Sequence, residues 1–166
     1  LSSLRMGELL QEAGVPDGVV NIVPGGGPCG AALAEHPDVD KITFTGSTST
    51  GQAIMRAAAG NLKKLSLELG GKSPNIIFAD ADLDAAVQSA AFSIFNNAGQ
   101  VCAAGSRLYL ERSIHDEFVH RLVQEGKKLR VGDSLDPSNS MGPVVSARQQ
   151  DRVKGYLDSG HAEGAT

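Results

Sequence analysis

Apolar residues in the first part of the chain follow two alternating patterns: short continuous runs, and positions repeated every three or four residues. This pattern predicts helices over 3–13, 28–36 and 49–59, with buried strands over 19–23, 41–45 and 64–69. Strands that alternate with helices at these lengths are typical of α/β proteins with a parallel sheet. We therefore expect these residues to form part of a doubly wound parallel sheet with helices on its faces.

The second part of the chain continues the alternation with longer helices. Strands are predicted over 75–79 and 107–111, and helices over 83–96, 113–129 and 146–159, with Gly160 ending the last one. Ser113 and Ser146 begin segments with the spacing of a capping box, and Asp80 or Asp82 can cap the helix that starts near residue 83. Residues 131–145 are rich in Gly, Pro and Ser and are expected to form a long loop.

A break in the pattern separates these two parts. Paired glycines and Pro74 interrupt the alternation between Gly70 and Ser73. We place the domain boundary there, which gives a first domain over 1–70 and a second over 71–166.

A loop of small residues in the second part carries a cysteine. Residues 96–107 read NNAGQVCAAGSR, so Cys102 follows a Gly-Gln turn and has Ala and Gly neighbours. A thiol in such a setting is sterically open, and cysteine is a strong nucleophile. Free cysteines are nevertheless more often inert core residues, so the loop alone does not make Cys102 catalytic. Cys29 has no comparable setting and is interpreted as structural.

A glutamate lies near the end of the last strand of the first domain. Residues 67–74 read LELGGKSP, so Glu68 alternates with leucines and would ordinarily point to solvent. If Glu68 instead enters a cleft, burial raises its pKa toward neutrality and suits it to act as a general base. The local pattern leaves both interpretations open.

Two glycine-rich turns follow predicted strands and precede predicted helices. At residues 45–51, TGSTSTG, free backbone N–H groups and the Ser47 hydroxyl can face a phosphate, although an ordinary Ser N-cap gives the same pattern. The GxGxxG at residues 25–30 is weaker because Pro28 lies inside it and Thr50 occupies the position where an acid is wanted. A plain strand–helix turn is the favoured interpretation of that second segment.

Composition excludes several other functions. The chain has 166 residues, a net charge of −4, and no basic cluster longer than two residues, so neither nucleic acid nor an anionic membrane is an expected partner. No apolar run approaches the roughly 20 residues of a membrane span. Two widely separated cysteines indicate a reducing compartment, which we take to be the cytoplasm. The four histidines are scattered, so no metal is expected.

The LELGGKSP and GQVCAAGSR segments, in this order and at this spacing, resemble the aldehyde dehydrogenase superfamily. The resemblance extends from the first residues to the last helix. It implies oxidation of a small-molecule aldehyde to a carboxylic acid with NAD or NADP as the acceptor. In that chemistry Cys102 attacks the carbonyl, hydride leaves for the nicotinamide, and Glu68 activates water to hydrolyse the resulting thioester.

The resemblance also implies a cofactor site in the first domain. It places Thr45 and Gly46 near the nicotinamide and Ser47 on the pyrophosphate. The full set of candidate cofactor-binding residues is Pro24, Gly25, Thr45, Gly46, Ser47, Gly51, Leu69 and Gly70.

The same resemblance bears on how much of an enzyme this chain represents. Residues 1–70 would be the later part of a Rossmann-like cofactor domain, and 71–166 the start of the catalytic domain. We expect these residues alone to be inactive and the full-length protein to be a homodimer or homotetramer.

Two other functions stay open. One is a non-catalytic structural or binding use of the same fold, against which the presence of both Cys102 and Glu68 argues. The other is a thioesterase or acyltransferase that uses Cys102 without a cofactor, which a failure to bind any dinucleotide would favour.

Overall fold

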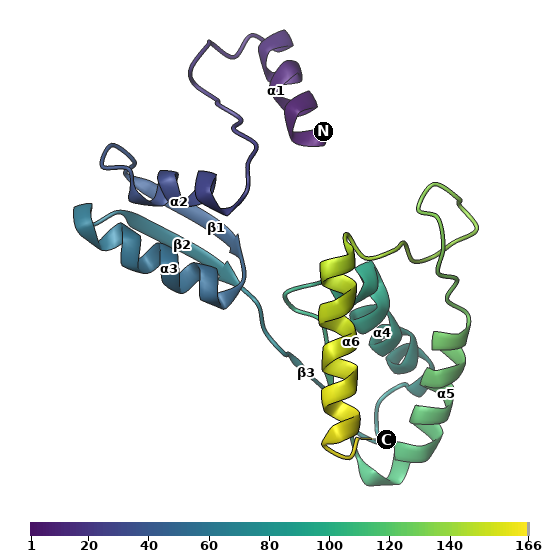
Figure 1. Cartoon of the computed structure of the whole chain (residues 1–166). Coiled ribbons are helices and arrows are strands. Elements are labelled where there is room, and N and C mark those ends of the chain that lie inside the picture. Colours follow the sequence, from purple (N-terminus) through teal and green to yellow (C-terminus); the bar gives the residue numbers. More distant parts are fainter. Residues whose placement is uncertain (166) are drawn as a thin grey trace. The chain divides into compact units, whose positions relative to one another are not determined.

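The computed structural model describes residues 1–165 and divides into two compact units, with the division between Leu69 and Gly70. Each unit contains a two-stranded parallel sheet together with helices (Figure 1). The expected α/β class with parallel strands is therefore confirmed.

The first unit contains three helices and two strands. They are α1 (Ser2–Glu12), α2 (Gly27–Glu35), β1 (Lys41–Gly46), α3 (Thr48–Ala58) and β2 (Lys64–Leu69). The strands β1 and β2 pair in parallel, with Lys41 opposite Lys64 and Gly46 opposite Leu69. The helix α3 connects them, contacts both strands, and packs against α2. This is the strand–helix–strand unit that the apolar spacing predicted.

A short turn joins α3 to β2 and includes a buried lysine. After the 3-10 turn Ala59–Asn61, Leu62 takes a left-handed conformation with φ of 56°. Lys63 is only 8% exposed, and its Nζ donates a 2.7 Å hydrogen bond to Oδ1 of Asn61. The Asn61 amide in turn donates to the carbonyl of Pro37 at 2.8 Å. Asn61 thus links the start of β2 to the loop that leads into β1.

The strand predicted over 19–23 is wrong, because this segment has no regular secondary structure. Val19 and Val23 are 67% and 64% exposed, while Ile22 packs against α1, 3.1 Å from where a Cβ on Gly7 would lie. Within residues 1–165, β1 pairs only with β2, so this apolar run has no neighbouring strand. A strand needs a partner for its backbone N–H and C=O groups, and hydrophobic composition cannot supply one.

Between residues 70 and 165 the second unit has two strands and three α-helices. They are β3 (Pro74–Ile77), α4 (Leu83–Phe95), β4 (Arg107–Leu110), α5 (His115–Lys127) and α6 (Ala147–Ala162), with 3-10 turns at Asn96–Gly99 and Arg112–Ile114. The strands β3 and β4 pair in parallel, with Pro74 opposite Arg107. The last helix continues past Gly160, so the helix end predicted there is wrong.

The core of this unit forms between the sheet and the helices α4 and α5. Phe118 on α5 is completely buried and packs with Val87 and Ala90 on α4. The apolar residues packed around this cluster are Ile77, Leu83, Ala86, Leu108, Leu110 and Leu122. Alternate residues of each strand therefore face the helices. Because Leu108 and Leu110 are held in this core, the position of β4 is fixed, and so is the end of the loop that precedes it.

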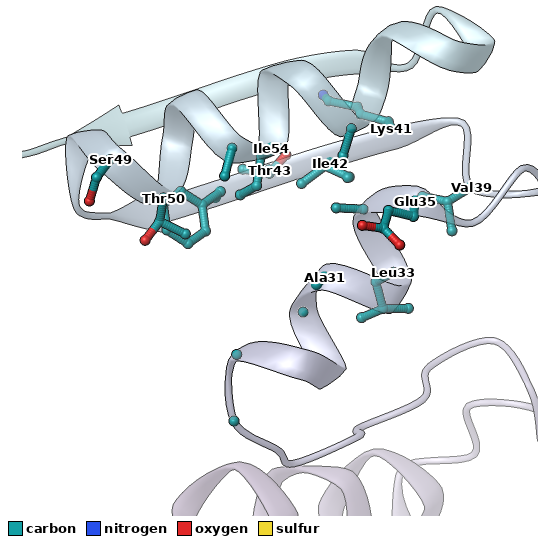
Figure 2. Close-up of a pocket in the computed structure, with 17 residues that line it drawn as sticks. Ala31, Leu33, Glu35, Val39, Lys41, Ile42, Thr43, Ser49, Thr50 and Ile54 are labelled. Carbon is teal, nitrogen blue, oxygen red and sulfur yellow. The ribbon is translucent and has the colours of Figure 1, made fainter.

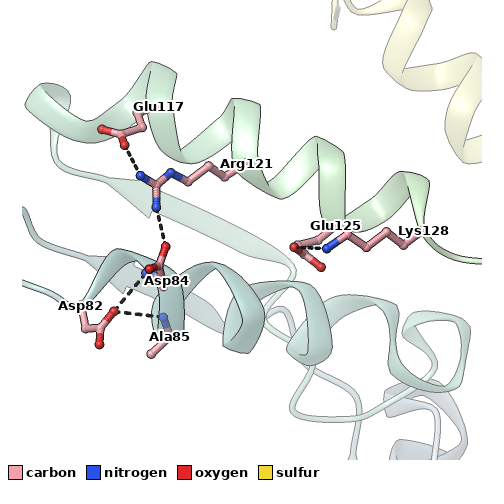
Figure 3. Close-up of polar contacts among 7 residues, drawn as sticks. All are labelled: Asp82, Asp84, Ala85, Glu117, Arg121, Glu125 and Lys128. Atoms are coloured by element: carbon pink, nitrogen blue, oxygen red, sulfur yellow. Dashed lines mark hydrogen bonds and ion pairs between the residues drawn. The ribbon is translucent and has the colours of Figure 1, made fainter.

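Carboxylates lie at the starts of α4 and α5, and one of them caps α4. Asp82 accepts hydrogen bonds from the N–H groups of Asp84 and Ala85 at 3.0 and 3.1 Å, which identifies it as the N-cap of α4 (Figure 3). Arg121 on α5 donates to Asp84 at 2.7 Å and also pairs with Glu117, so it joins the two helices (Figure 3). These groups are exposed, and such pairs contribute about 0–1 kcal/mol.

The capping box predicted at Ser113 does not form, whereas the Ser146 cap does. Ser146 accepts the Gln149 N–H at 3.3 Å, as predicted. The Ser113 hydroxyl instead donates to Glu111 at 2.9 Å, and the same carboxylate accepts the Ala79 N–H at 2.8 Å. These two hydrogen bonds, first that from Ala79, lower the pKa of Glu111. Ser113 lies inside the 3-10 turn Arg112–Ile114, so it is not at the start of α5.

Within the described residues 1–165, no helix is long and apolar enough to cross a membrane. The same residues contain no cluster of three or more His, Cys, Asp or Glu side chains that could hold a metal ion.

The burial of Phe118 predicts a large and local effect on stability. Phe118→Ala should lower the free energy of unfolding by about 3–5 kcal/mol, because it leaves a cavity where α4, α5 and the sheet meet. The matched control is Tyr156→Ala, since Tyr156 is an aromatic residue on α6 that is 71% exposed. Its cost should stay below about 0.5 kcal/mol. Denaturant unfolding measures both, and equal costs would show that Phe118 is not the centre of the core.

Candidate active site

The candidate residues of the first unit meet at the carboxyl ends of its two strands. Thr45 lies opposite Glu68, and Gly46 lies opposite Leu69, in the parallel register of β1 and β2. Ligands of open α/β sheets bind outside this edge of the strands. Glu68 is exposed there, while Leu65 and Leu67 are partly buried. The glutamate therefore points away from the leucine side, as simple alternation along the strand requires.

The start of α3 lies directly beyond this edge. Ser47 is its N-cap and accepts the Thr50 N–H at 3.2 Å, while its hydroxyl also lies 2.8 Å from Oγ1 of Thr50. The ordinary N-cap is thus formed, and backbone N–H groups of the first turn remain the natural donors to an anion. Gly51 is buried on the same helix, and a Cβ there would come within 2.7 Å of the Leu69 side chain. The glycine lets α3 approach the end of β2.

A hollow of about 870 Å³ opens between α2, β1 and α3 (Figure 2). Gly27, Gly30 and Leu33 of α2 form one side of it, and Ala53 and Ile54 of α3 form another. Its walls are mostly apolar, and the start of α3 lies at its margin, with Ser49 and Thr50 among the lining residues (Figure 2). Such a space suits a flat, largely apolar group attached to an anion.

None of the candidate cofactor-binding residues named from the sequence is among these lining residues. Gly26 and Gly27 line the hollow, whereas their neighbours Pro24 and Gly25 do not, and the candidates at the strand ends, such as Gly46 and Ser47, lie close in sequence to lining residues rather than among them. A Cβ on Gly25 would come within 2.5 Å of the Cys29 side chain, so this turn packs closely on the start of α2. The only sequence signal for the hollow was the excess of Gly and Ala on α2.

Cys102 lies in a tight turn of the second unit and is exposed. The Ala104 N–H donates to the Val101 carbonyl at 3.0 Å, which closes the turn around the cysteine. Within residues 1–165, the Cys102 N–H donates no backbone hydrogen bond. An open thiol beside a free amide donor is an arrangement suited to attack on a carbonyl, whose oxygen becomes negative.

The loop around Cys102 is held from the helix that precedes it. The Gly105 N–H donates to the carbonyl of Ser93 on α4 at 3.2 Å. A Cβ on Gly105 would lie 2.7 Å from Oγ of Ser93 and 3.3 Å from the side chain of Asn75, so only glycine fits without displacement. Ala104 is buried. The small residues in this loop are therefore required by packing as well as by access to the thiol.

A left-handed segment leads into the cysteine turn. Asn97, Ala98 and Gly99 have φ values of 51°, 56° and 72°. This conformation is unfavourable for Ala98 in particular, which has a Cβ and no polar side chain to compensate. The Asn97 carbonyl accepts the Gln100 N–H at 3.1 Å, and its side chain donates to the Gln100 carbonyl at 3.2 Å. The predicted break at Asn96-Asn97 is therefore a specific strained turn.

The glycine segment at the start of the second unit contacts the cysteine turn. A Cβ on Gly71 would lie 3.4 Å from the Cys102 carbonyl oxygen. The following carbonyl, that of Lys72, accepts a 2.8 Å hydrogen bond from Nε of Arg107. The structure thus brings Thr45 to Gly51 together with Glu68 and Leu69, and it places Gly71, the neighbour of the predicted Gly70, beside the Cys102 turn.

The first unit has glycine-rich turns at the carboxyl edge of a parallel sheet, and the second has an exposed cysteine in a tight turn. These features indicate an α/β enzyme that uses a nucleotide cofactor and a cysteine. Comparison with known proteins identifies the family. The sequence matches the aldehyde dehydrogenase family over residues 1–166. The chain belongs to this family of oxidoreductases.

Two mammalian relatives illustrate the match. Retinal dehydrogenase 2 of Mus musculus is 55% identical over 167 positions, which cover 99% of this chain and 32% of that protein. Aldehyde dehydrogenase 1A1 of Bos taurus is 54% identical, with 99% and 33% covered. The chain therefore spans about a third of the length of these relatives.

Solved structures agree closely with this fold. The NAD+ complex of aldehyde dehydrogenase from Bacillus cereus has a TM-score of 0.98 and 49% identity, and the match covers 100% of this chain and 34% of that one. PnpE in complex with nicotinamide adenine dinucleotide has a TM-score of 0.96 and 53% identity, with 99% and 34% covered.

The different surroundings of the two cysteines predict different reactivity. Cys102 is exposed, whereas Cys29 is half-buried with Sγ 3.8 Å from the Val23 carbonyl. Limiting iodoacetamide should alkylate Cys102 at least about tenfold faster, because access to the sulfur controls the reaction. Peptide mass spectrometry measures both rates, with Cys102→Ser and Cys29→Ser as assignment controls. Faster alkylation of Cys29 would contradict the exposed position of Cys102.

Proposed function

We propose that this chain carries the nucleophile, the general base and part of the cofactor site of an NAD(P)-dependent dehydrogenase that oxidises an aldehyde to a carboxylic acid. The observation that carries the proposal is the exposed Cys102 in a closed turn, with the Gly71 backbone against its carbonyl. Membership of the aldehyde dehydrogenase family supports the reaction class.

Cys102 is the proposed nucleophile. Its thiolate attacks the aldehyde carbon, a carbon–sulfur bond forms, and the carbonyl oxygen becomes an oxyanion. The Cys102 N–H is directed to no backbone acceptor among residues 1–165 and is the proposed donor to that oxyanion. Ala103 and Gly105, which follow Cys102, have little or no side chain and leave space for a substrate to approach the sulfur.

Glu68 is the proposed general base. After oxidation the acyl group is held on Cys102 as a thioester, and its hydrolysis requires a water molecule that has lost a proton. Glu68 accepts that proton, the water oxygen bonds to the acyl carbon, and the thiolate of Cys102 leaves. The position of Glu68 at the carboxyl end of β2, the edge where ligands of open α/β sheets bind, and membership of the aldehyde dehydrogenase family support this role.

The first unit fits a dinucleotide. The hollow of about 870 Å³ between α2, β1 and α3 has the apolar walls that an adenine ring requires, and the start of α3 supplies donors for phosphate. We propose that Gly46 and Ser47 hold the pyrophosphate, and that Pro24, Gly25, Thr45, Gly51, Leu69 and Gly70 border the cofactor. When bound, NAD or NADP supplies the acceptor for the hydride. Named NAD complexes among the similar structures support this assignment.

The organisation of the whole protein is also a proposal. Residues 1–70 are proposed to belong to the dinucleotide-binding domain and 71–166 to the catalytic domain, in a cytoplasmic homodimer or homotetramer. The division of the structure between Leu69 and Gly70 supports the boundary.

Glu68→Gln tests the two halves of the reaction separately. Glutamine preserves the shape of the residue but cannot accept a proton, so steady-state turnover in the full-length protein should fall about a hundredfold or more. The first burst of NAD(P)H should survive, because it precedes hydrolysis. Rapid-mixing absorbance measures both phases. Cys102→Ala is the control that should remove the burst and the turnover together, and wild-type turnover by Glu68→Gln would exclude the base role.

Ser47→Asp tests the phosphate position. Aspartate is as good an N-cap as serine, so α3 should remain capped while a negative charge is added where the pyrophosphate is proposed. Cofactor affinity in the full-length protein should fall by at least about tenfold, whereas Ser3→Asp on the exposed start of α1 should leave it unchanged. Calorimetry measures both affinities, and equal values for the two variants would place the phosphate elsewhere.

A further inference from the structure

Arg107 connects the cysteine-bearing loop to the segment that follows Glu68. It is the first residue of β4, and its backbone N–H donates to the Ser73 carbonyl at 3.2 Å. Its side chain makes a second contact with the same segment, because Nε donates to the Lys72 carbonyl at 2.8 Å. One residue therefore anchors two successive carbonyls of the stretch between Glu68 and β3.

The aromatic ring of Tyr109 holds this side chain in place. The central carbon of the guanidinium lies 5.8 Å from the centre of the Tyr109 ring, and Nη1 lies 3.4 Å from the phenol oxygen. Arginine has a rigid planar group whose donors keep fixed directions when it stacks on a ring. Support from Tyr109 thus leaves Nε directed at the Lys72 carbonyl.

The anchored segment also contacts the cysteine turn. Gly71, which precedes Lys72, lies so close to Cys102 that a Cβ on it would be 3.4 Å from the Cys102 carbonyl oxygen. The turn itself has other supports, since Gly105 bonds to Ser93 and Ala104 bonds to Val101. Loss of the Arg107 side chain would consequently free the Gly70–Lys72 segment more than it would free the cysteine.

We propose that Arg107 is a positioning residue that acts, through the Lys72 carbonyl, on the hydrolysis step rather than on the attack by Cys102. The proposal rests on the proposed roles of Cys102 and Glu68. Lys72 lies four residues after Glu68 in the sequence, so the bond to its carbonyl holds the segment that leaves β2. Cys102 keeps its own hydrogen-bonded turn and needs this anchor less.

The hydrogen bond from Nε of Arg107 can be distinguished from a general effect of the positive charge on this side chain. The bond is made by Nε, and lysine has a methylene group at that position in its side chain. Arg107→Lys keeps the charge but loses this donor, and Arg107→Met loses both. The two variants should therefore behave alike if the hydrogen bond to the Lys72 carbonyl is what matters.

The test uses the full-length protein and measures the first turnover and the steady state by rapid mixing. For Arg107→Met and Arg107→Lys, steady-state turnover should fall about tenfold, the size expected for loss of one hydrogen bond from a charged donor. The rate of the first NAD(P)H formation should stay within about twofold of wild type. Arg112→Met is the matched control, because Arg112 is an exposed arginine five residues further on, and it should match wild type in both phases.

A second variant and a folding check keep the outcome clear. Tyr109→Leu leaves Arg107 in place but removes its support, so it should lower steady-state turnover in the same direction and by less. Thermal unfolding establishes that each variant is folded. If both phases fall equally in folded Arg107→Met, or if Arg107→Lys restores wild-type turnover, the positioning role is wrong. The proposed function has its own test, since aldehyde oxidation that survives Cys102→Ala would refute it whatever the Arg107 variants do.

Discussion

The parallel register of β1 and β2 is the constraint on which the candidate site of the first unit depends. It pairs Ile42 with Leu65 and Phe44 with Leu67, so the apolar residues of both strands lie on the partly buried side. A slip of one residue would reverse every side chain of β2 and turn Glu68 toward the helices. The packing of the leucines therefore determines the direction of the carboxylate, and the same register brings Thr45 and Gly46 to the strand ends beside it.

Alternation along β4 has a similar effect in the second unit. Leu108 and Leu110 face the core around Phe118, which leaves Arg107 and Tyr109 together on the opposite side of the strand. Their spacing of two residues is what allows the guanidinium to lie against the phenol ring. The packing of Leu108 and Leu110 in the core thus sets the position of Arg107, which is not in the core itself. Arg107 bonds to the Lys72 carbonyl, next to the glycine that lies beside Cys102.

Elements whose partners lie nearby in the sequence could be predicted, and those that depend on distant or competing partners could not. Residues 41–45 and 64–69 form strands because they pair with each other, whereas 19–23 has the same apolar character and no partner within residues 1–165. The cap at Ser113 failed because Ser113 lies inside the 3-10 turn Arg112–Ile114 and α5 begins only at His115. The motifs single out Cys102 and Glu68 as candidates, but the hollow between α2 and α3 depends on a packing of helices that no local pattern records.

The strain before Cys102 and the exposure of its thiol have a common cause. Packing in the core fixes α4, which ends at Phe95, and β4, which begins at Arg107. Residues 96–106 must therefore connect two ends whose positions are already set. The left-handed turn at Asn97 and Ala98 redirects the chain as it leaves α4, and the bond from Gly105 to Ser93 returns it to the same helix. Between these two attachments the turn at 101–104 projects outward. An unfavourable backbone conformation persists only where surrounding contacts impose it, and here the result is a cysteine that is open to solvent yet attached on both sides.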